Sequence, residues 1–161
     1  MTSTTRRQPR QPRQPLPTDP LALERQVCFA LSVASRTVLG IYRPLLEPMG
    51  LTHPQYLVML ALWGTSPLSV KQIGELLQLD SATLSPMIKR LAAAGLITRM
   101  RSASDERQLE VALTDAGRAL RDEAEKIPPA VVARLGMPIE ELERLHRTLT
   151  KVIRAAQART P

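Results

Sequence analysis

The chain has 161 residues, 43% of them hydrophobic and 23% charged, and a formal net charge of +7 at pH 7. This length allows one domain with its own core, and the basic excess is typical of proteins that bind a polyanion such as nucleic acid or an acidic membrane surface. No run approaches the ~18 apolar residues of a membrane span, and the N-terminus lacks the apolar core of a signal peptide, so we expect a cytoplasmic protein with no membrane partner. The single cysteine, Cys28, excludes an intramolecular disulfide and agrees with a reducing compartment.

Residues 1–18 form a basic segment of repeated Gln-Pro-Arg triplets with almost no apolar side chain to bury. Such a composition predicts a disordered tail. The tail has four arginines and no acidic residue, so subtracting four from +7 leaves +3 for residues 19–161. We therefore expect a single folded domain over residues 19–161, in which the location of positive charge matters more than its total.

Two long helical patterns come first in this domain. Asp19 can cap a helix whose apolar stripe continues to about Tyr42, where Pro44 bends or ends it. Thr52 begins a second helix, and the strongly apolar body of residues 56–63 predicts burial on nearly all sides. Because the chain has only four Phe, Tyr and Trp residues, aliphatic side chains on such helices must build most of the core.

A helix-turn-helix pattern occupies the centre of the chain. Ser69 caps a short amphipathic helix, and a polar turn leads to a second helix that Ser81 can cap and Gly95 can end. The apolar positions of this second helix recur at 3.6-residue spacing, while its opposite face carries hydroxyl and cationic groups of the types that reach phosphates and base edges in a major groove. The DNA-contacting residues predicted on this helix are Ser81, Thr83, Ser85, Lys89 and Arg90.

Two short segments after this helix alternate apolar and polar residues around a polar loop, which predicts a two-stranded wing. Arg99 and Arg101 on the first strand are expected to contact phosphates. At the tip, Asp105 can brace Arg107, whose guanidinium could enter a minor groove; an ordinary solvated turn is the alternative. Residues 51–114 are thus predicted to form a winged helix-turn-helix, and the fold class is mainly α with a small β-wing.

Helical patterns on both sides of this module carry apolar stripes. One helix ends before Pro128-Pro129, and a last helix follows Pro138. The stripes of residues 19–50 and 115–161 exceed what one small winged helix could cover. We therefore expect these segments to form a dimerisation region.

Cys28 lies among apolar residues of the first helix, where a free cysteine is usually a small core residue. Ser32 and Ser35 lie one and two turns along the same face, and Tyr42 and His53 could approach from the next elements. Hydroxyls and an imidazole around a thiol can stabilise the thiolate, the form that attacks a peroxide. These residues leave packing and redox chemistry both open. No set of His, Cys or carboxylate residues has metal-ligand spacing and no Gly-rich loop could cradle phosphate, so no metal or cofactor is expected.

Five segments resemble those of a known family: Arg25-Gln-Val-Cys-Phe-Ala-Leu31, Tyr42-Arg-Pro-Leu-Leu46, Pro54-Gln-Tyr-Leu57, Leu79-Asp-Ser-Ala-Thr-Leu-Ser-Pro86 and Asp105-Glu-Arg107. Together with the order of helices, helix-turn-helix and wing, they are similar to the MarR family of bacterial transcription regulators, in its organic-hydroperoxide-sensing branch of the OhrR type. The resemblance covers the chain from about Leu21 to its end.

The resemblance implies a homodimeric repressor that binds a pseudo-palindromic operator in double-stranded DNA and releases it when an organic hydroperoxide oxidises Cys28. Tyr42 matches one of two tyrosines that hydrogen-bond this cysteine in the family, whereas His53 stands where the other is usual. A neutral His53 could hydrogen-bond as tyrosine does, and a protonated one would favour the thiolate. Since the chain has no partner cysteine, oxidised Cys28 is expected to become a sulfenic acid and then a mixed disulfide with a small thiol, a sulfenamide or an over-oxidised acid.

Two other functions are compatible with these patterns. A MarR-type regulator that responds to a phenolic or other small-molecule ligand would have the same fold and use Cys28 for packing. A thiol peroxidase would need a resolving cysteine, which the chain lacks, so we do not expect an enzyme.

Overall fold

The computed structural model describes residues 19–101 and 109–158, and the chain divides into a first unit up to Val38 and a second unit from Leu39 onward. A short 3-10 helix, Leu23–Arg25, lies in the first unit. It is followed by α1, Val27–Leu46, whose last residues belong to the second unit. The element order of the second unit is that of a winged helix.

The first long helix begins at Val27, so the predicted start directly after Asp19 is wrong. The Asp19 carboxylate accepts the backbone N–H of Leu21 at 2.9 Å, a local bond that favours a turn, and the extended backbone of Gln26 separates the 3-10 helix from α1. Pro44 lies inside α1 and does not end it. Because Pro44 is in the last turn, its missing N–H removes only one bond near the helix end.

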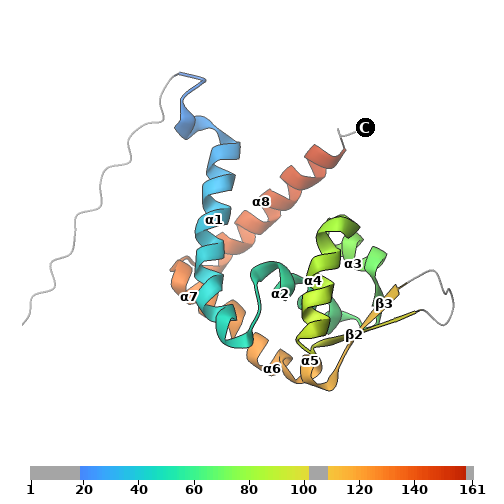
Figure 1. Cartoon of the computed structure of the whole chain (residues 1–161). Coiled ribbons are helices and arrows are strands. Elements are labelled where there is room, and N and C mark those ends of the chain that lie inside the picture. The colour runs from blue at the N-terminus through green and yellow to red at the C-terminus, as the bar shows by residue number, and fades with distance from the viewer. Residues whose placement is uncertain (1–18, 102–108, 159–161) are drawn as a thin grey trace, which may run out of the picture. The chain divides into compact units, whose positions relative to one another are not determined.

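The helices and strands of the second unit follow the predicted order (Figure 1). They are the 3-10 helix Glu47–Met49, α2 His53–Gly64, β1 Leu68–Ser69, α3 Val70–Leu77, α4 Ser81–Ala93, β2 Ile97–Arg101, β3 Leu109–Leu113, α5 Asp115–Ala119, α6 Arg121–Ala124, α7 Ile127–Leu135 and α8 Ile139–Gln157. The predicted start of α2 at Thr52 is confirmed, since both the backbone N–H and the hydroxyl of Thr52 donate to Gln55 Oε1 at 2.9 Å.

Three strands form an antiparallel sheet in the order β1-β3-β2. The hairpin of β2 and β3 pairs Ile97 with Leu113, which confirms the predicted wing strands. On its other edge β3 pairs with β1, where Leu68 lies opposite Val111. Sequence periodicity does not predict β1, because a two-residue strand has no period and its partner is distant in the chain.

One aliphatic core joins α2, α3, α4 and the sheet. Its completely buried side chains are Leu46, Val58, Met59, Ile73, Leu84, Leu91 and Val111, each with 0% exposure. Leu60 on α2 is 44% exposed, so the prediction that this helix is buried on nearly all sides is wrong on one face. The core fixes α4 by its apolar face and leaves its polar face to solvent.

The segment after the wing forms the three short helices α5, α6 and α7, and Pro128-Pro129 lies in the first turn of α7. The prediction that these prolines follow a helix end is therefore incomplete. A fixed φ and a missing N–H suit a first helical turn equally well. The last helix, α8, begins after Pro138 as predicted and buries none of its residues. In the part of the chain that the structure describes, no helix has the length and apolarity needed to cross a bilayer.

Candidate nucleic-acid interface

The helix-turn-helix depends on a close approach at Gly74. Ser69 caps α3 by accepting the N–H of Gln72 at 3.1 Å, and the helix ends at Leu77, after which the left-handed backbone of Gln78, with a φ of 55°, turns the chain. A Cβ at Gly74 would lie 2.8 Å from the carbonyl oxygen of Leu79, so only glycine lets the turn pass this close to α3. The turn thereby holds the start of α4 against α3.

Asp80 caps α4, so the prediction that Ser81 does so is wrong by one residue. Asp80 Oδ1 accepts the backbone N–H of Thr83 at 2.7 Å, and Ser81 is the first helical residue. The hydrogen bonds from Thr83 lower the pKa of the exposed Asp80 carboxyl below its usual 3.8. Gly95, with a φ of 73°, follows the end of the helix as predicted. An ionised carboxylate therefore stands at the start of this helix.

The polar face of α4 is exposed, as the sequence predicts. Leu84, Ile88 and Leu91 are buried on the opposite face. The five predicted contact residues Ser81, Thr83, Ser85, Lys89 and Arg90 are all exposed. The Ser85 hydroxyl donates to the Ser81 carbonyl oxygen at 2.7 Å, which leaves the hydroxyl oxygen as an acceptor. The helix thus presents hydroxyl groups near its start and cations toward its end.

The wing carries two exposed arginines on β2. Arg99 pairs across the hairpin with Val111, whose side chain is completely buried, and Arg101 has the same strand parity. Both arginines therefore lie on the side of the sheet that packs against the helices, and both are exposed. The predicted tip residues Asp105 and Arg107 lie outside the described residues.

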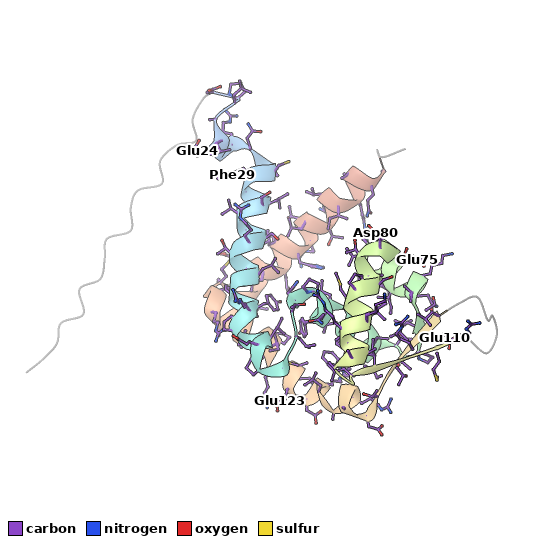
Figure 2. The ribbon with its side chains drawn as sticks, viewed as in Figure 1. Glu24, Phe29, Glu75, Asp80, Glu110 and Glu123 are labelled. Atoms are coloured by element: carbon purple, nitrogen blue, oxygen red, sulfur yellow. The ribbon has the colours of Figure 1, made fainter. Side chains whose placement is uncertain are left out.

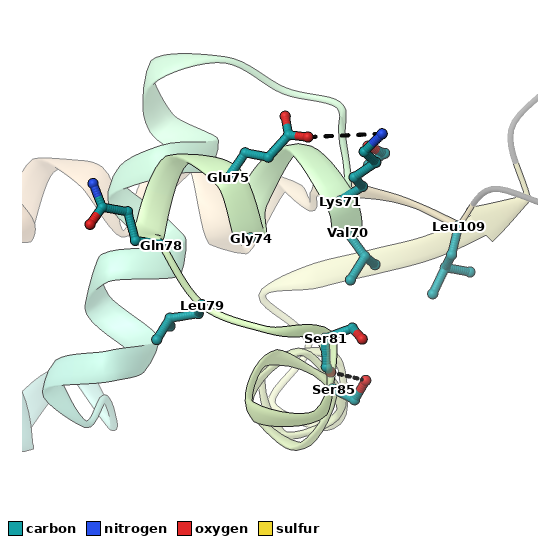
Figure 3. Close-up of a pocket in the computed structure, with 10 residues that line it drawn as sticks. Val70, Lys71, Gly74, Glu75, Gln78, Leu79, Ser81, Ser85 and Leu109 are labelled. Atoms are coloured by element: carbon teal, nitrogen blue, oxygen red, sulfur yellow. Dashed lines mark hydrogen bonds and ion pairs between the residues drawn. The ribbon is translucent and has the colours of Figure 1, made fainter. Parts of the chain in front are cut away.

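A groove of about 820 Å³ opens between α3, the start of α4 and β3 (Figure 3). Its lining includes Ser81, Ser85 and Lys71, and the Lys71 ammonium lies 3.9 Å from the Glu75 carboxylate. The sequence analysis does not include Lys71 among the DNA-contacting residues. In helix-turn-helix motifs the first helix crosses the DNA backbone, so a cation in the first turn of α3 is the signal that could have identified Lys71. Figure 2 shows Glu75 and Asp80 at the same end of the α3–α4 pair. Carboxylates therefore gather at the turn end of this surface.

A second candidate site lies at the start of α2. The rings of Tyr42 and His53 meet edge to face with centroids 4.8 Å apart, so these two predicted residues do lie together. Burial lowers the pKa of His53 below its usual 6.5, which favours the neutral imidazole near neutral pH. Tyr56 joins the pair at 6.2 Å from Tyr42 and 6.5 Å from His53, and burial, then the nearby Tyr42, raises its pKa above 10.0. The sequence assigns Tyr56 only to the core, although its spacing of three residues from His53 on one helix signals the contact.

Cys28 lies on α1 in the first unit and is exposed. Ser32 and Ser35, predicted along its face, are exposed as well. The Tyr42–His53 pair belongs to the second unit, and its approach to Cys28 stays a prediction.

Comparison with known proteins identifies the family. Residues 51–109 match the model of the MarR family. The organic hydroperoxide resistance transcriptional regulator of Bacillus subtilis is 44% identical over 131 residues, which cover 81% of this chain and 89% of that protein. The structure of reduced AbfR bound to DNA, from Staphylococcus epidermidis, has a TM-score of 0.69 at 35% identity over 83% of this chain and 94% of that one. A structure of disulfide-formed AbfR has a TM-score of 0.59 at 37% identity over 82% and 92% of the two chains. The chain therefore belongs to the MarR family of DNA-binding transcription regulators, and not to a family of enzymes.

Proposed function

We propose that this protein is a homodimeric repressor that releases its operator when an organic hydroperoxide oxidises Cys28. The observation that carries the proposal is the exposed position of the only cysteine, in a chain 44% identical to an organic hydroperoxide resistance regulator. The two AbfR structures, one reduced and bound to DNA and one with a disulfide formed, support thiol chemistry on this fold. The protein would act in the cytoplasm, where a free thiol stays reduced until a peroxide arrives.

The terminal helices support a dimer. α1 and α8 leave large apolar side chains uncovered in the single chain. These side chains are Val27, Phe29, Leu31, Leu145, Val152 and Ile153, with exposures between 36% and 65%. Uncovered apolar stripes of this kind favour burial against a second copy, and residues 19–50 and 115–161 would supply that interface.

In the dimer, the two α4 helices would enter successive major grooves of a pseudo-palindromic operator, about one DNA turn or ~34 Å apart. Ser81, Thr83 and Ser85 would face base edges, while the cations of α4 and β2 would contact phosphates. The wing tips, with Asp105 and Arg107, would reach the flanking minor grooves.

The proposed reaction at Cys28 is a single displacement. The thiolate sulfur attacks the terminal oxygen of the hydroperoxide; the S–O bond forms as the O–O bond breaks, and the alkoxide takes a proton and leaves as an alcohol. The cysteine becomes a sulfenic acid. Displacement of its hydroxyl by a small thiol would give a mixed disulfide and water, whereas a sulfenamide or an over-oxidised acid are the other end products. Tyr42 and His53 would hydrogen-bond the thiolate and supply protons.

Oxidation makes the Cys28 site larger and more polar. In the dimer a second copy would cover α1, and packed side chains accept added volume poorly, so the helices around Cys28, Tyr42 and His53 would shift and the two α4 helices would lose their spacing. A loss of ~1.4 kcal/mol in binding free energy already weakens binding about tenfold.

A gel-shift titration on the DNA upstream of the protein's own gene tests this function. Wild type and Cys28→Ser are compared with and without an organic hydroperoxide, and dithiothreitol is then added. We expect reversible release by wild type alone. Equal behaviour of the two proteins would reduce Cys28 to a packing residue and favour the other MarR-type function, a response to a phenolic or other small-molecule ligand.

A further inference from the structure

Three of the chain's four Phe, Tyr and Trp residues form one row that runs from Tyr42 near the end of α1 to Tyr56 and Trp63 on α2. The row begins at the edge-to-face pair of Tyr42 and His53. The Tyr56 ring follows at 6.2 Å from Tyr42, and the Trp63 ring lies a further 6.2 Å from Tyr56, again edge to face. In a chain so poor in aromatic residues, this concentration joins the two ends of α2 by rigid side chains in direct succession.

The far end of the row is tied to the helices that follow the wing. The Trp63 indole N–H donates to the carbonyl oxygen of Gly117 on α5 at 2.8 Å. The Arg121 guanidinium on α6 donates to the Trp63 carbonyl oxygen at 3.2 Å. Two hydrogen bonds between distant parts of the sequence therefore fix the end of α2 to α5 and α6.

Gly117 in turn touches the junction between the recognition helix and the wing. A Cβ at Gly117 would overlap the carbonyl oxygen of Leu96, the residue that leads from α4 into β2. The backbone N–H of Thr114 donates to that same oxygen at 3.1 Å, and its hydroxyl donates to the Gly95 carbonyl oxygen at 2.7 Å. α5 thus lies directly against the end of α4, as Figure 1 also shows, and the contact is made by backbone atoms.

A hollow of about 280 Å³ lies beside the row and is lined by Tyr56, Leu60, Trp63, Arg121 and neighbouring residues. Tyr56 and Trp63 are therefore packed along the row but have open space on one side. A small shift of either ring toward the hollow therefore meets less resistance than a shift into the packed core.

We propose that Tyr56 and Trp63 transmit the state of the Tyr42–His53 pair to the junction of α4 and β2, with the Trp63–Gly117 hydrogen bond as the link that moves the recognition helix. This inference rests on the proposed function, because the Tyr42–His53 pair is where oxidation of Cys28 would be felt. A displaced Tyr42 or His53 ring pushes Tyr56, and Trp63 carries the shift to Gly117. Since Gly117 contacts Leu96 through backbone, the end of α4 and the base of the wing must follow. Tyr56 and Trp63 act as positioning residues that touch neither peroxide nor DNA.

The test is Trp63→Phe, which keeps an aromatic ring in the row and removes only the donor to Gly117. Its matched control is Leu60→Ala, which changes the same helix and the same hollow without touching the row's hydrogen bonds. For each protein we would measure the operator Kd of the reduced and the oxidised form, and the rate of Cys28 oxidation by thiol titration. We expect Trp63→Phe to keep the wild-type oxidation rate and reduced-state Kd, while the ratio of oxidised to reduced Kd falls by about threefold or more. Leu60→Ala should keep the full ratio.

An unchanged ratio in Trp63→Phe overturns the coupling while leaving the proposed function standing. A wild type that binds DNA equally well in both states overturns the proposed function, and the coupling with it. Should Trp63→Phe fail to fold, Arg121→Ala, at an exposed position, removes the bond to the Trp63 carbonyl oxygen and so loosens the end of α2 that holds the Trp63–Gly117 link; the ratio should fall here as well. A purely structural role would lower the melting temperature without changing the ratio, so thermal unfolding is recorded for every variant.

Discussion

The Asp80 carboxylate accepts the backbone N–H of Thr83 at 2.7 Å, so the recognition helix begins with a bonded acid on the surface that presents Ser81 and Ser85. Asparagine caps a helix about as well as aspartate but carries no charge. Alanine lacks both the charge and the side-chain oxygen that caps the helix. We expect Asp80→Asn to fold like wild type and to bind unrelated DNA more tightly, because a carboxylate repels phosphates. Asp80→Ala should lower the melting temperature. Fluorescence anisotropy on an operator and an unrelated duplex, with thermal unfolding, measures both effects; an alanine variant as stable as wild type contradicts the capping role.

The same carboxylate gives a pH dependence of known sign. The bonds from Thr83 lower the pKa of Asp80 below 3.8, so in acid the unfolded chain binds a proton that the folded chain does not. The stabilisation by the Asp80 carboxylate is therefore complete above pH 3.8 and is lost as the pH falls through the lowered folded-state pKa. In Asp80→Asn this loss of folding stability at low pH should be absent.

Local signals in the sequence are enough to predict the helix-turn-helix and the wing, because Ser69, Gly95 and the apolar positions of α4 specify caps and faces within a few residues of each other. Where two adjacent residues can both cap a helix, the pattern can place the cap one residue away from its true position, as it does with Asp80 and Ser81. Proline at Pro128 is compatible with a helix end and with a helix start, and neighbouring residues do not decide between them.

Contacts between distant segments have no periodic signature. The Trp63–Gly117 hydrogen bond joins residues 54 positions apart, and β1 forms only because Leu68 meets Val111 in the folded chain. For the same reason the sequence places Tyr56 in the core without indicating that its ring touches Tyr42. The candidate thiol site depends on such contacts more than the DNA surface does, and so less of it is predictable.

Gly74 should be the least replaceable glycine of the helix-turn-helix. A Cβ at this position would lie 2.8 Å from the Leu79 carbonyl oxygen and 3.3 Å from the Leu84 side chain, so the turn has to move. We expect Gly74→Ala to lower the free energy of unfolding by about 1–3 kcal/mol, despite the better helix propensity of alanine. Gly40→Ala is the matched control, because nothing lies within 4 Å of its Cβ position on α1, and it should gain about 0.5–1 kcal/mol. Urea titration of both variants measures the two signs; a stabilised Gly74→Ala contradicts the close approach.

Arg99 should bind phosphate without reading sequence. It is exposed on the side of β2 that packs against the helices, so its guanidinium is available to the DNA backbone beside the groove that α4 enters. We expect Arg99→Ala to weaken binding to operator and unrelated DNA alike and to reduce the slope of log K against log salt by about 1. Met100→Ala, the next residue on the opposite face of the strand, is the control and should leave the slope unchanged. A loss confined to one operator sequence would instead assign Arg99 to base recognition.

His53 should make folding stability depend on pH in the range where histidine titrates. Burial lowers its pKa below 6.5, so between the lowered folded-state value and pH 6.5 the unfolded chain binds more protons than the folded chain. Stability therefore carries no penalty above pH 6.5, falls as the pH drops below it, and levels off beneath the folded-state pKa. Urea titrations from about pH 5 to about pH 8 should give a rising free energy of unfolding for wild type and a smaller rise for His53→Tyr, which removes the half-buried imidazole. If His53→Tyr retains the full dependence, other groups cause it and His53 is not held neutral by burial beside Tyr42.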